Sequence, residues 1–415
     1  MATGYDGKII RGNMSRWSGL PKDLCQHILS GSTLKGINRF KAVCPSWSAA
    51  ADEMIKSPTF TCSPETTWLV LPGDMNKGEA IDGSSRFYSL DGNFYNSNTN
   101  MPEETREAIC FGSSHGWLVL LNDQLDFMLT TPFLPGIQLS LPPLKTFPDI
   151  LSITYHKGTT YAYNIVDHFK LERKTAILPI KEDFTSVKDL ASKLMRAKAV
   201  LSSRPTFSSK DQIGVMVIYM FGLEEIRYNS LAFCTTSDHK WTKLEERKWY
   251  MEIMGRDNEF FVLMKDYTVD VWNFGTSSIP MKKMEIKPDA CALLAGPTKK
   301  CHKVYLIKTA GTGLMLVAMD YHMSLDRLHV YQMEGETPVW KEVESIGNNV
   351  LVLGSNNSRV MSHHESLRCD SDSIYYVKKS NSGSYNLKVF SLKDKSNKEV
   401  CELPVDFEPL AFSGL

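Results

Sequence analysis

The feature that most constrains this chain is a long series of short apolar or aromatic runs that begins just after Phe60. Residues 68–71 (W-L-V-L) end at Pro72-Gly73, and residues 86–90 (R-F-Y-S-L) end at Asp91-Gly92. Such dipeptides mark tight turns, and short apolar runs between turns are typical of β-strands. The pattern predicts a large all-β domain.

Further runs of this kind follow along the chain, at residues 117–121, 127–129, 161–166, 214–220, 231–234, 260–264, 268–274, 304–307, 314–319, 328–333, 350–353, 374–377 and 387–392. Many short strands without a long helix favour a β-propeller, because radial repetition of small sheets leaves few exposed strand edges. One stretch differs. Residues 187–199 place Leu190 and Leu194 on one face and lysines on the other, which predicts a helix that connects two blades or offers a basic docking site.

A faint repeat supports the propeller. The segments K-W-T-K-L-E and V-W-K-E-V-E each carry a tryptophan within a strand-like run, and Trp241 and Trp340 are 99 residues apart. This distance equals two units of about 50 residues, the period of kelch-type blades. Over about 350 residues this period predicts six or seven blades.

The first 60 residues follow a helical period instead. Pro21 stands where a first helical residue is expected, because its fixed φ suits that position and its missing N–H is not needed there. A second helical pattern begins near Lys35. The apolar positions of both patterns share one face, formed by Leu20, Leu24, Ile28, Leu29, Ile37, Phe40, Val43, Cys44 and Trp47. About 40 residues bury too little alone, so either the rest of this chain or another protein must cover this face.

The Leu20-Pro21 start and the R-F-x-x-V-C-x-x-W ending resemble the F-box. This module docks the substrate receptors of Skp-cullin-F-box (SCF) ubiquitin ligases on a Skp-type adaptor. Gly36 and Pro45 depart from the common pattern, and both residues weaken a helix. The resemblance implies an adaptor-binding face made of Leu20, Pro21, Leu24, Ile28, Leu29, Phe40, Val43, Cys44 and Trp47.

The rest of the chain resembles a second family. The K-W-T segment at Trp241, residues 340–355 (W-K-E-V-E-S-I-G-N-N-V-L-V-L-G-S) and the S-I-Y-Y-V and L-K-V-F-S-L runs are similar to the plant domain-of-unknown-function 295 group. That domain is usually found directly behind an F-box, so the resemblance implies a plant protein. The expected fold is therefore α+β and multidomain: a flexible segment at residues 1–16, an all-α F-box at 17–60 and an all-β propeller-like, substrate-recognising domain at 61–410.

The amino-acid composition restricts the classes of binding partner and the cellular location that we expect. Lys plus Arg and Asp plus Glu number 47 each, so no global basic field is available for nucleic acid or a membrane surface. Nine cysteines without a C-x-x-C pair, behind an N-terminus without an apolar signal run, indicate reduced thiols. The apolar runs are far too short to span a bilayer. We expect a soluble intracellular protein of the nucleus, the cytoplasm or both.

Chemical motifs are scarce. Adjacent His363 and His364 on a strand point to opposite faces and cannot easily share a metal ion, and Cys301-His302 lacks further ligands at a usual spacing. We expect no catalytic residue, no metal and no cofactor. Three functions stay open: a ligase receptor that binds an adaptor, through it a cullin, and an unidentified substrate protein; an F-box-derived scaffold without ligase activity; and an enzyme in a propeller pocket.

Overall fold

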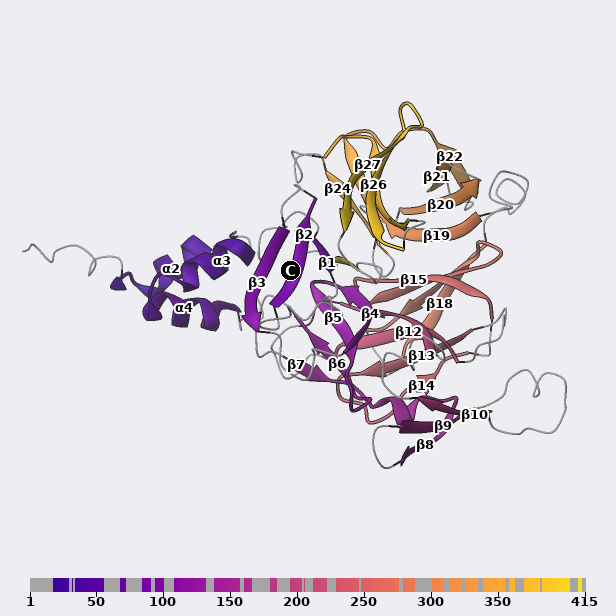
Figure 1. Cartoon of the computed structure of the whole chain (residues 1–415), viewed down its shortest axis with the longest axis horizontal. Helices are drawn as coiled ribbons and strands as arrows, with labels where there is room; N and C mark the ends of the chain where they lie inside the picture. Colours follow the sequence, from indigo (N-terminus) through magenta and orange to yellow (C-terminus); the bar gives the residue numbers. More distant parts are fainter. Residues whose placement is uncertain are drawn as a thin grey trace, which may run out of the picture. The chain divides into compact units, whose positions relative to one another are not determined.

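The computed structural model describes residues 18–29, 32, 34–55, 68–71, 84–90, 94–100, 108–131, 138–156, 160–165, 180–184, 195–203, 205, 212–221, 229–245, 248–275, 279–287, 301–309, 313–322, 325–334, 339–354, 358–362, 369–380, 383–403 and 410–412. The chain divides into two compact units (Figure 1). One comprises Met1–Glu65 with Thr206–Asp211 and Leu415, and the other comprises Thr66–Pro205 and Gln212–Gly414.

The described part of the first unit contains three helices, α2 (Lys22–Leu29), α3 (Leu34–Lys41) and α4 (Pro45–Ile55). The first helix begins one residue later than predicted, and the Pro21 carbonyl accepts hydrogen bonds from its first turn. The predicted continuous second helix through Trp47 is wrong, because the chain turns after Lys41 and a new helix begins at Pro45. Proline fits a first helical position, so Pro45 starts α4 and does not weaken α3.

Five sheets of the second unit are each built from four or five consecutive strands, and we number these blades in chain order. Blade 1 contains β4 (Ile109–Ser114), β5 (Trp117–Leu121), β6 (Phe127–Thr130) and β7 (Gln138–Ser140). Blade 2 contains β11 (Met195–Leu201), β12 (Gly214–Phe221), β13 (Ser230–Thr235) and β14 (Thr242–Lys243). Blade 3 contains β15 (Tyr250–Arg256), β16 (Glu259–Met264), β17 (Val269–Asn273) and β18 (Met281–Ile286).

Blade 4 contains β19 (Cys301–Lys308), β20 (Leu314–His322), β21 (Leu325–Glu334) and β22 (Val339–Val343). Blade 5 contains β23 (Asn349–Leu353), β24 (Ser358–Ser362), β25 (Ser373–Lys379), β26 (Tyr385–Ser391) and β27 (Asn397–Leu403), with β24 as its first strand in space. Two further sheets differ. A three-stranded sheet holds β8 (Ile150–His156), β9 (Thr160–Ile165) and β10 (Ile180–Phe184), and a terminal sheet joins β28 (Leu410–Phe412) to β1 (Trp68–Leu71), β2 (Ser84–Ser89) and β3 (Phe94–Asn100).

The first strands of successive blades contact one another in chain order, β4 with β11, β11 with β15, β15 with β19 and β19 with β24. The terminal sheet contacts blade 1 through β28 and shares a hydrophobic cluster with blade 5. This arrangement confirms the predicted propeller. The predicted count of six or seven blades is wrong, since the described residues form five blades of consecutive strands. The count assumed that all strands belong to blades of consecutive strands, whereas β8 to β10 form a separate three-stranded sheet and β28 joins β1, β2 and β3 from the other end of the chain.

Strands in the middle of a blade are buried on both faces, because a blade packs against a neighbour on each side. All five residues of β5 are buried, as are all six of β13. Continuous apolar runs are what such strands require, and the strand-like runs of the sequence fall on strands. The predicted helix at residues 187–199 is wrong at its described end, where residues 195–199 belong to β11 and pair with β12; residues 187–194 lie outside the described residues.

The two tryptophans of the faint repeat link neighbouring blades. The Trp241 indole Nε1 of blade 2 donates to the Pro142 carbonyl, which follows blade 1, at 2.8 Å. The Trp340 Nε1 of blade 4 donates to the Tyr267 carbonyl of blade 3 at 3.4 Å. The two residues sit two blades apart, as the spacing of two units predicted.

Candidate functional site

The predicted adaptor-binding face is divided between solvent and the interior of the helical unit. Leu24, Ile28 and Val43 are 52%, 46% and 55% exposed. Leu24 and Ile28 lie four residues apart and therefore on one side of α2. Leu29 and Phe40 are buried instead. Among the described residues of the helical unit, three large apolar side chains are thus left about half exposed.

The remaining predicted residues take intermediate positions. Pro21 is exposed, whereas Leu20 and Cys44 are half-buried. The half-buried Trp47 ring stacks on Phe40, with 4.3 Å between the ring centroids. Trp47 therefore contributes to the packing of α4 on α3. The sequence pattern missed four buried positions among the described residues: Cys25 of α2, and Ala50, Ala51 and Ile55 of α4. The three in α4 were missed because the pattern assumed two helices.

Two ion pairs connect α4 to the other helices, Lys22 with Glu53 and Lys41 with Asp52. Exposed pairs of this kind contribute at most about 1 kcal/mol each. The burial of Ala51 and Ile55 is the larger contribution to holding α4, because apolar burial gives about 25 cal/mol for each Å² removed from water.

The first strands of the blades surround a small cavity of about 20 Å³. Its lining includes Ser113 and Ser114 of β4, Lys198 of β11, Glu252 of β15 and Ser358 of blade 5. A volume of this size has room for about one water molecule. The cavity therefore cannot hold a substrate.

Two glycines keep these strands close together. A Cβ on Gly112 would lie 2.0 Å from the Ala199 carbonyl oxygen, and a Cβ on Gly255 would lie 2.0 Å from the Leu201 carbonyl oxygen. Within the cavity, Lys198 forms an ion pair with Glu252, which also accepts a hydrogen bond from the Ile253 N–H at 2.8 Å. Both charges are satisfied by the protein itself.

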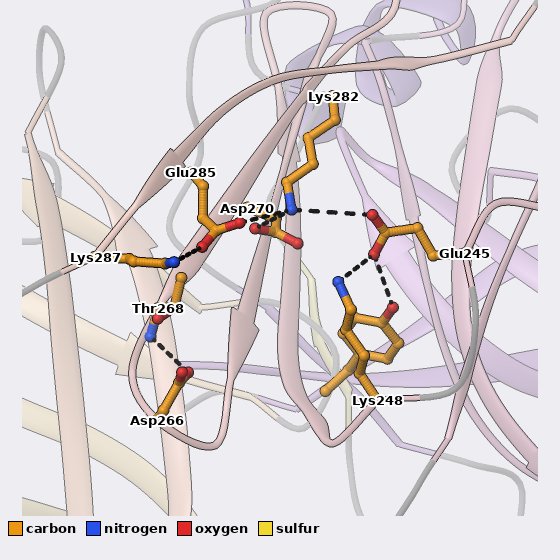
Figure 2. Close-up of polar contacts among 9 residues, drawn as sticks. Glu245, Lys248, Asp266, Thr268, Asp270, Lys282, Glu285 and Lys287 are labelled. Atoms are coloured by element: carbon orange, nitrogen blue, oxygen red, sulfur yellow. Dashed lines mark hydrogen bonds and ion pairs between the residues drawn. The ribbon is translucent and has the colours of Figure 1, made fainter.

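A charged network lies where blade 2 meets blade 3 (Figure 2). The Lys282 ammonium is 2.8 Å from an Asp270 oxygen, 3.0 Å from a Glu285 oxygen and 3.9 Å from a Glu245 oxygen. Lys248 in turn contacts Glu245 at 2.7 Å. Asp270 is fully buried, and this burial raises the pKa of its carboxyl although Lys282 opposes the rise.

The described part of the chain gives little support for a metal site. No group of three or more His, Cys, Asp or Glu side chains there is placed to hold a metal ion. His363 and His364 lie outside the described residues, and so do the side chains of Cys301 and His302. No helix among the described residues has the length and apolar character needed to cross a bilayer.

Comparison with known proteins places the chain in a family. It is 22% identical to F-box/kelch-repeat protein KIB1 of Arabidopsis thaliana, over 82% of this chain and 73% of that protein. It is also 22% identical to F-box protein SKIP23 of the same plant, over 88% of this chain and 84% of that protein. These relatives confirm the resemblance to plant F-box proteins with a propeller-like region. The family model for the KIB1-4 beta-propeller matches residues 87–391, and the chain therefore belongs to the KIB1-4 beta-propeller family.

Proposed function

We propose that this chain is a substrate receptor of an SCF-type ubiquitin ligase, in which residues 17–60 bind a Skp-type adaptor and residues 61–410 bind a target protein. The observation that supports the proposal is the exposure of Leu24, Ile28 and Val43 on a helical unit that buries Cys25, Leu29 and Phe40. The F-box names of its relatives point the same way. Such a receptor works inside the cell, in the nucleus or the cytoplasm.

The exposed side chains contribute part of the free energy of such a contact. Burying one large apolar side chain completely contributes about 1.5 to 3 kcal/mol. Leu24, Ile28 and Val43 are each about half exposed, so covering all three contributes roughly 2 to 4 kcal/mol. Leu20 and Pro21 extend the same face at the start of α2, whereas Leu29, Phe40, Cys44 and Trp47 support it from within.

In this role the chain carries out no chemistry. Ubiquitin transfer belongs to other subunits, which reach the adaptor through a cullin, and the receptor raises the effective concentration of the target. Of the two residues that favour a scaffold without ligase partners, Pro45 begins α4 and leaves α3 intact, whereas Gly36 lies inside α3.

Adaptor binding tests the proposal. We expect the full-length chain to bind a purified Skp-type adaptor, and the double variant Leu20→Ala with Pro21→Ala to lose this binding. Truncating Leu24 alone to Ala should cost about 1 kcal/mol, or roughly fivefold in affinity, because only its exposed half is left for the adaptor to cover. Met281→Ala is the matched control, because Met281 is an exposed apolar residue of the propeller.

Circular dichroism of each variant establishes that both units stay folded. Undiminished adaptor binding by the double variant, or no binding by the unaltered chain, would refute the receptor role. An equal loss caused by Met281→Ala would show that the effect is not specific to the helical unit.

A further inference from the structure

The outer strand of blade 3 exposes two methionines beside an open strand edge. β18 is the last strand of its sheet and pairs with β17, and no other strand of the described residues pairs with it. Met281 and Met284 are 65% and 50% exposed. Among the described residues of the second unit, only these two and Leu151 are large apolar residues with at least half of their surface exposed.

A β-bulge brings both methionines to one face of the sheet. Residues three apart in a regular strand point to opposite faces. The register of β18 with β17 skips Lys283, however, so Met281 lies opposite Asn273 and Met284 lies opposite Val271. Cross-strand partners share a face, and Val271 packs against residues of blade 4. Met281 and Met284 therefore form one apolar strip on the blade 4 side of β18, which we call the β18 strip.

The charged side chains beside the β18 strip already have partners within blade 3. Each ammonium group of residues 281–287 lies 2.8 Å from a carboxylate oxygen: Lys282 from Asp270, Lys283 from Glu259 and Lys287 from Glu285. Two of these pairs are drawn in Figure 2. Since positive and negative charges balance here, a charged ligand gains little by replacing the pairs, and an uncharged ligand fits this edge better.

The size of the β18 strip favours one extended segment over a second copy of this chain. β18 has six residues, which extend over about 20 Å. With one layer of side chains about 10 Å wide, the strip covers roughly 200 Å². A stable dimer buries about 800 Å² on each partner, so the strip is too small for one. An added strand fits the fold, because blade 5 already contains five strands, with β27 in the fifth place.

We propose that the outer edge of β18 binds an extended, uncharged segment of the target protein as a fifth strand of blade 3. This inference rests on the proposed receptor function and names the surface that holds the target. Main-chain hydrogen bonds to β18 provide affinity, and apolar side chains at alternate positions of the segment contact Met281 and Met284. Methionine side chains are flexible, so the strip adapts to different apolar side chains.

The test follows methionine methyl groups by NMR of the full chain, isotopically labelled at those groups. The probe is a peptide of about eight residues in which Thr and Val alternate and both ends are blocked. We expect it to shift the Met281 and Met284 signals, which Met281→Leu and Met284→Leu assign, but not the signal of the fully buried Met216. The same peptide, N-methylated at two consecutive central residues, cannot pair with a strand edge and should shift neither signal.

Fluorescence anisotropy with the labelled peptide measures the contribution of the strip. The double variant Met281→Gln with Met284→Gln should bind the peptide at least about fivefold more weakly, because both apolar contacts are lost. The matched control is Val339→Gln with Val400→Gln, which changes exposed apolar residues on the outer strands of blades 4 and 5. This control should bind the peptide as the unaltered chain does.

Three results would overturn the inference: no shift of either methyl signal up to about 1 mM peptide, equal shifts with the N-methylated peptide, or equal losses in the two double variants. A dimer of the unaltered chain that the methionine double variant abolishes would also overturn it, because a second copy would then cover the strip. Adaptor binding is measured on the same proteins. If they bind the adaptor normally, a failed peptide result refutes strand addition and leaves the receptor function standing.

Discussion

Replacing Lys282 by Met should destabilise the propeller in a pH-dependent way. Methionine preserves most of the apolar length of the lysine but removes the ammonium that lies 2.8 Å from Asp270. Asp270 is fully buried, so its carboxyl must then be either charged without its closest counter-ion or protonated. Breaking one side of a buried ion pair typically costs 3 to 5 kcal/mol.

Protonation of the Asp270 carboxyl sets an upper limit to this loss of stability. Holding a carboxyl protonated costs about 1.4 kcal/mol for each pH unit above its ordinary pKa. From the ordinary value of 3.8, the ceiling is roughly 4 kcal/mol near pH 7 and below about 2 kcal/mol near pH 5. Burial already raises the pKa of Asp270 in the unaltered protein, so part of the cost is present before the substitution. We therefore expect a net loss of about 2 to 3 kcal/mol near pH 7.

The direction of the pH dependence follows from the linkage between proton binding and folding. A carboxyl whose pKa is higher in the folded state favours folding below its ordinary pKa, and this stability is lost as pH rises toward the folded value. Lys282→Met raises the pKa of Asp270 further, since the lysine opposes the effect of burial. The loss of unfolding free energy should therefore grow from about pH 5 to about pH 7.

Urea unfolding at these two pH values, followed by tryptophan fluorescence, measures the effect. Adding Asp270→Asn to Lys282→Met should restore most of the stability, because a neutral amide needs no counter-ion. Lys283→Met is the matched control, since Lys283 is an exposed neighbour whose pair with Glu259 contributes at most about 1 kcal/mol. A loss that is the same at both pH values, or a double variant as unstable as Lys282→Met, would refute the reasoning.

Three other outcomes are expected. Gly255→Ala should unfold the propeller or destabilise it by more than about 3 kcal/mol, because the new Cβ would overlap the Leu201 carbonyl; a thermal transition unchanged from the unaltered protein would contradict this. Trp241→Phe should cost roughly 1 to 3 kcal/mol in urea unfolding, since the Pro142 carbonyl loses its indole donor, and a neutral effect would show that the link between blades 1 and 2 is dispensable. A fragment that starts at Thr66 should give a mainly β circular dichroism spectrum, and a dominant helical spectrum would exclude an independent β domain.

The strands were the most predictable part of the fold. Runs such as the W-L-V-L-L of β5 are apolar throughout because neighbouring blades cover both faces of the strand. A helix of five residues would not need an apolar side chain at every position. The start of the helical unit was predictable for a similar reason. Leu24 and Ile28 are spaced for one face of α2, and both are indeed on one exposed side.

The wrong predictions fall where the spacing of apolar residues is compatible with two different structures. Phe40, Val43 and Trp47 match one helical stripe, although the chain turns before Pro45 and starts α4 there. In residues 187–199, the spacing of Leu190 and Leu194 suits a helix, but pairing with β12 determines the described end of the segment. Local pattern carries no information about such long-range pairing.

The charged network between blades 2 and 3 was not predictable from the sequence. Glu245, Asp270 and Lys282 stand in three separate segments, without a common spacing or motif. Asp270 and Lys282 become neighbours because β17 and β18 pair in an antiparallel register. The wrong blade count has a related origin, since chain length alone does not show which strands form a separate three-stranded sheet.

The terminal sheet also has a consequence for biosynthesis. β1 pairs with β2 on one edge and with β28 on the other, and β28 follows β1 by about 340 residues. At about 5 to 20 residues per second, a ribosome needs roughly 17 to 70 s to translate that stretch. During this time one edge of β1 has no β28 to pair with, and an open strand edge is a template for pairing with other chains. The helical unit is translated before this interval begins, so a nascent chain exposes its F-box-like face while β1 still lacks its second partner strand.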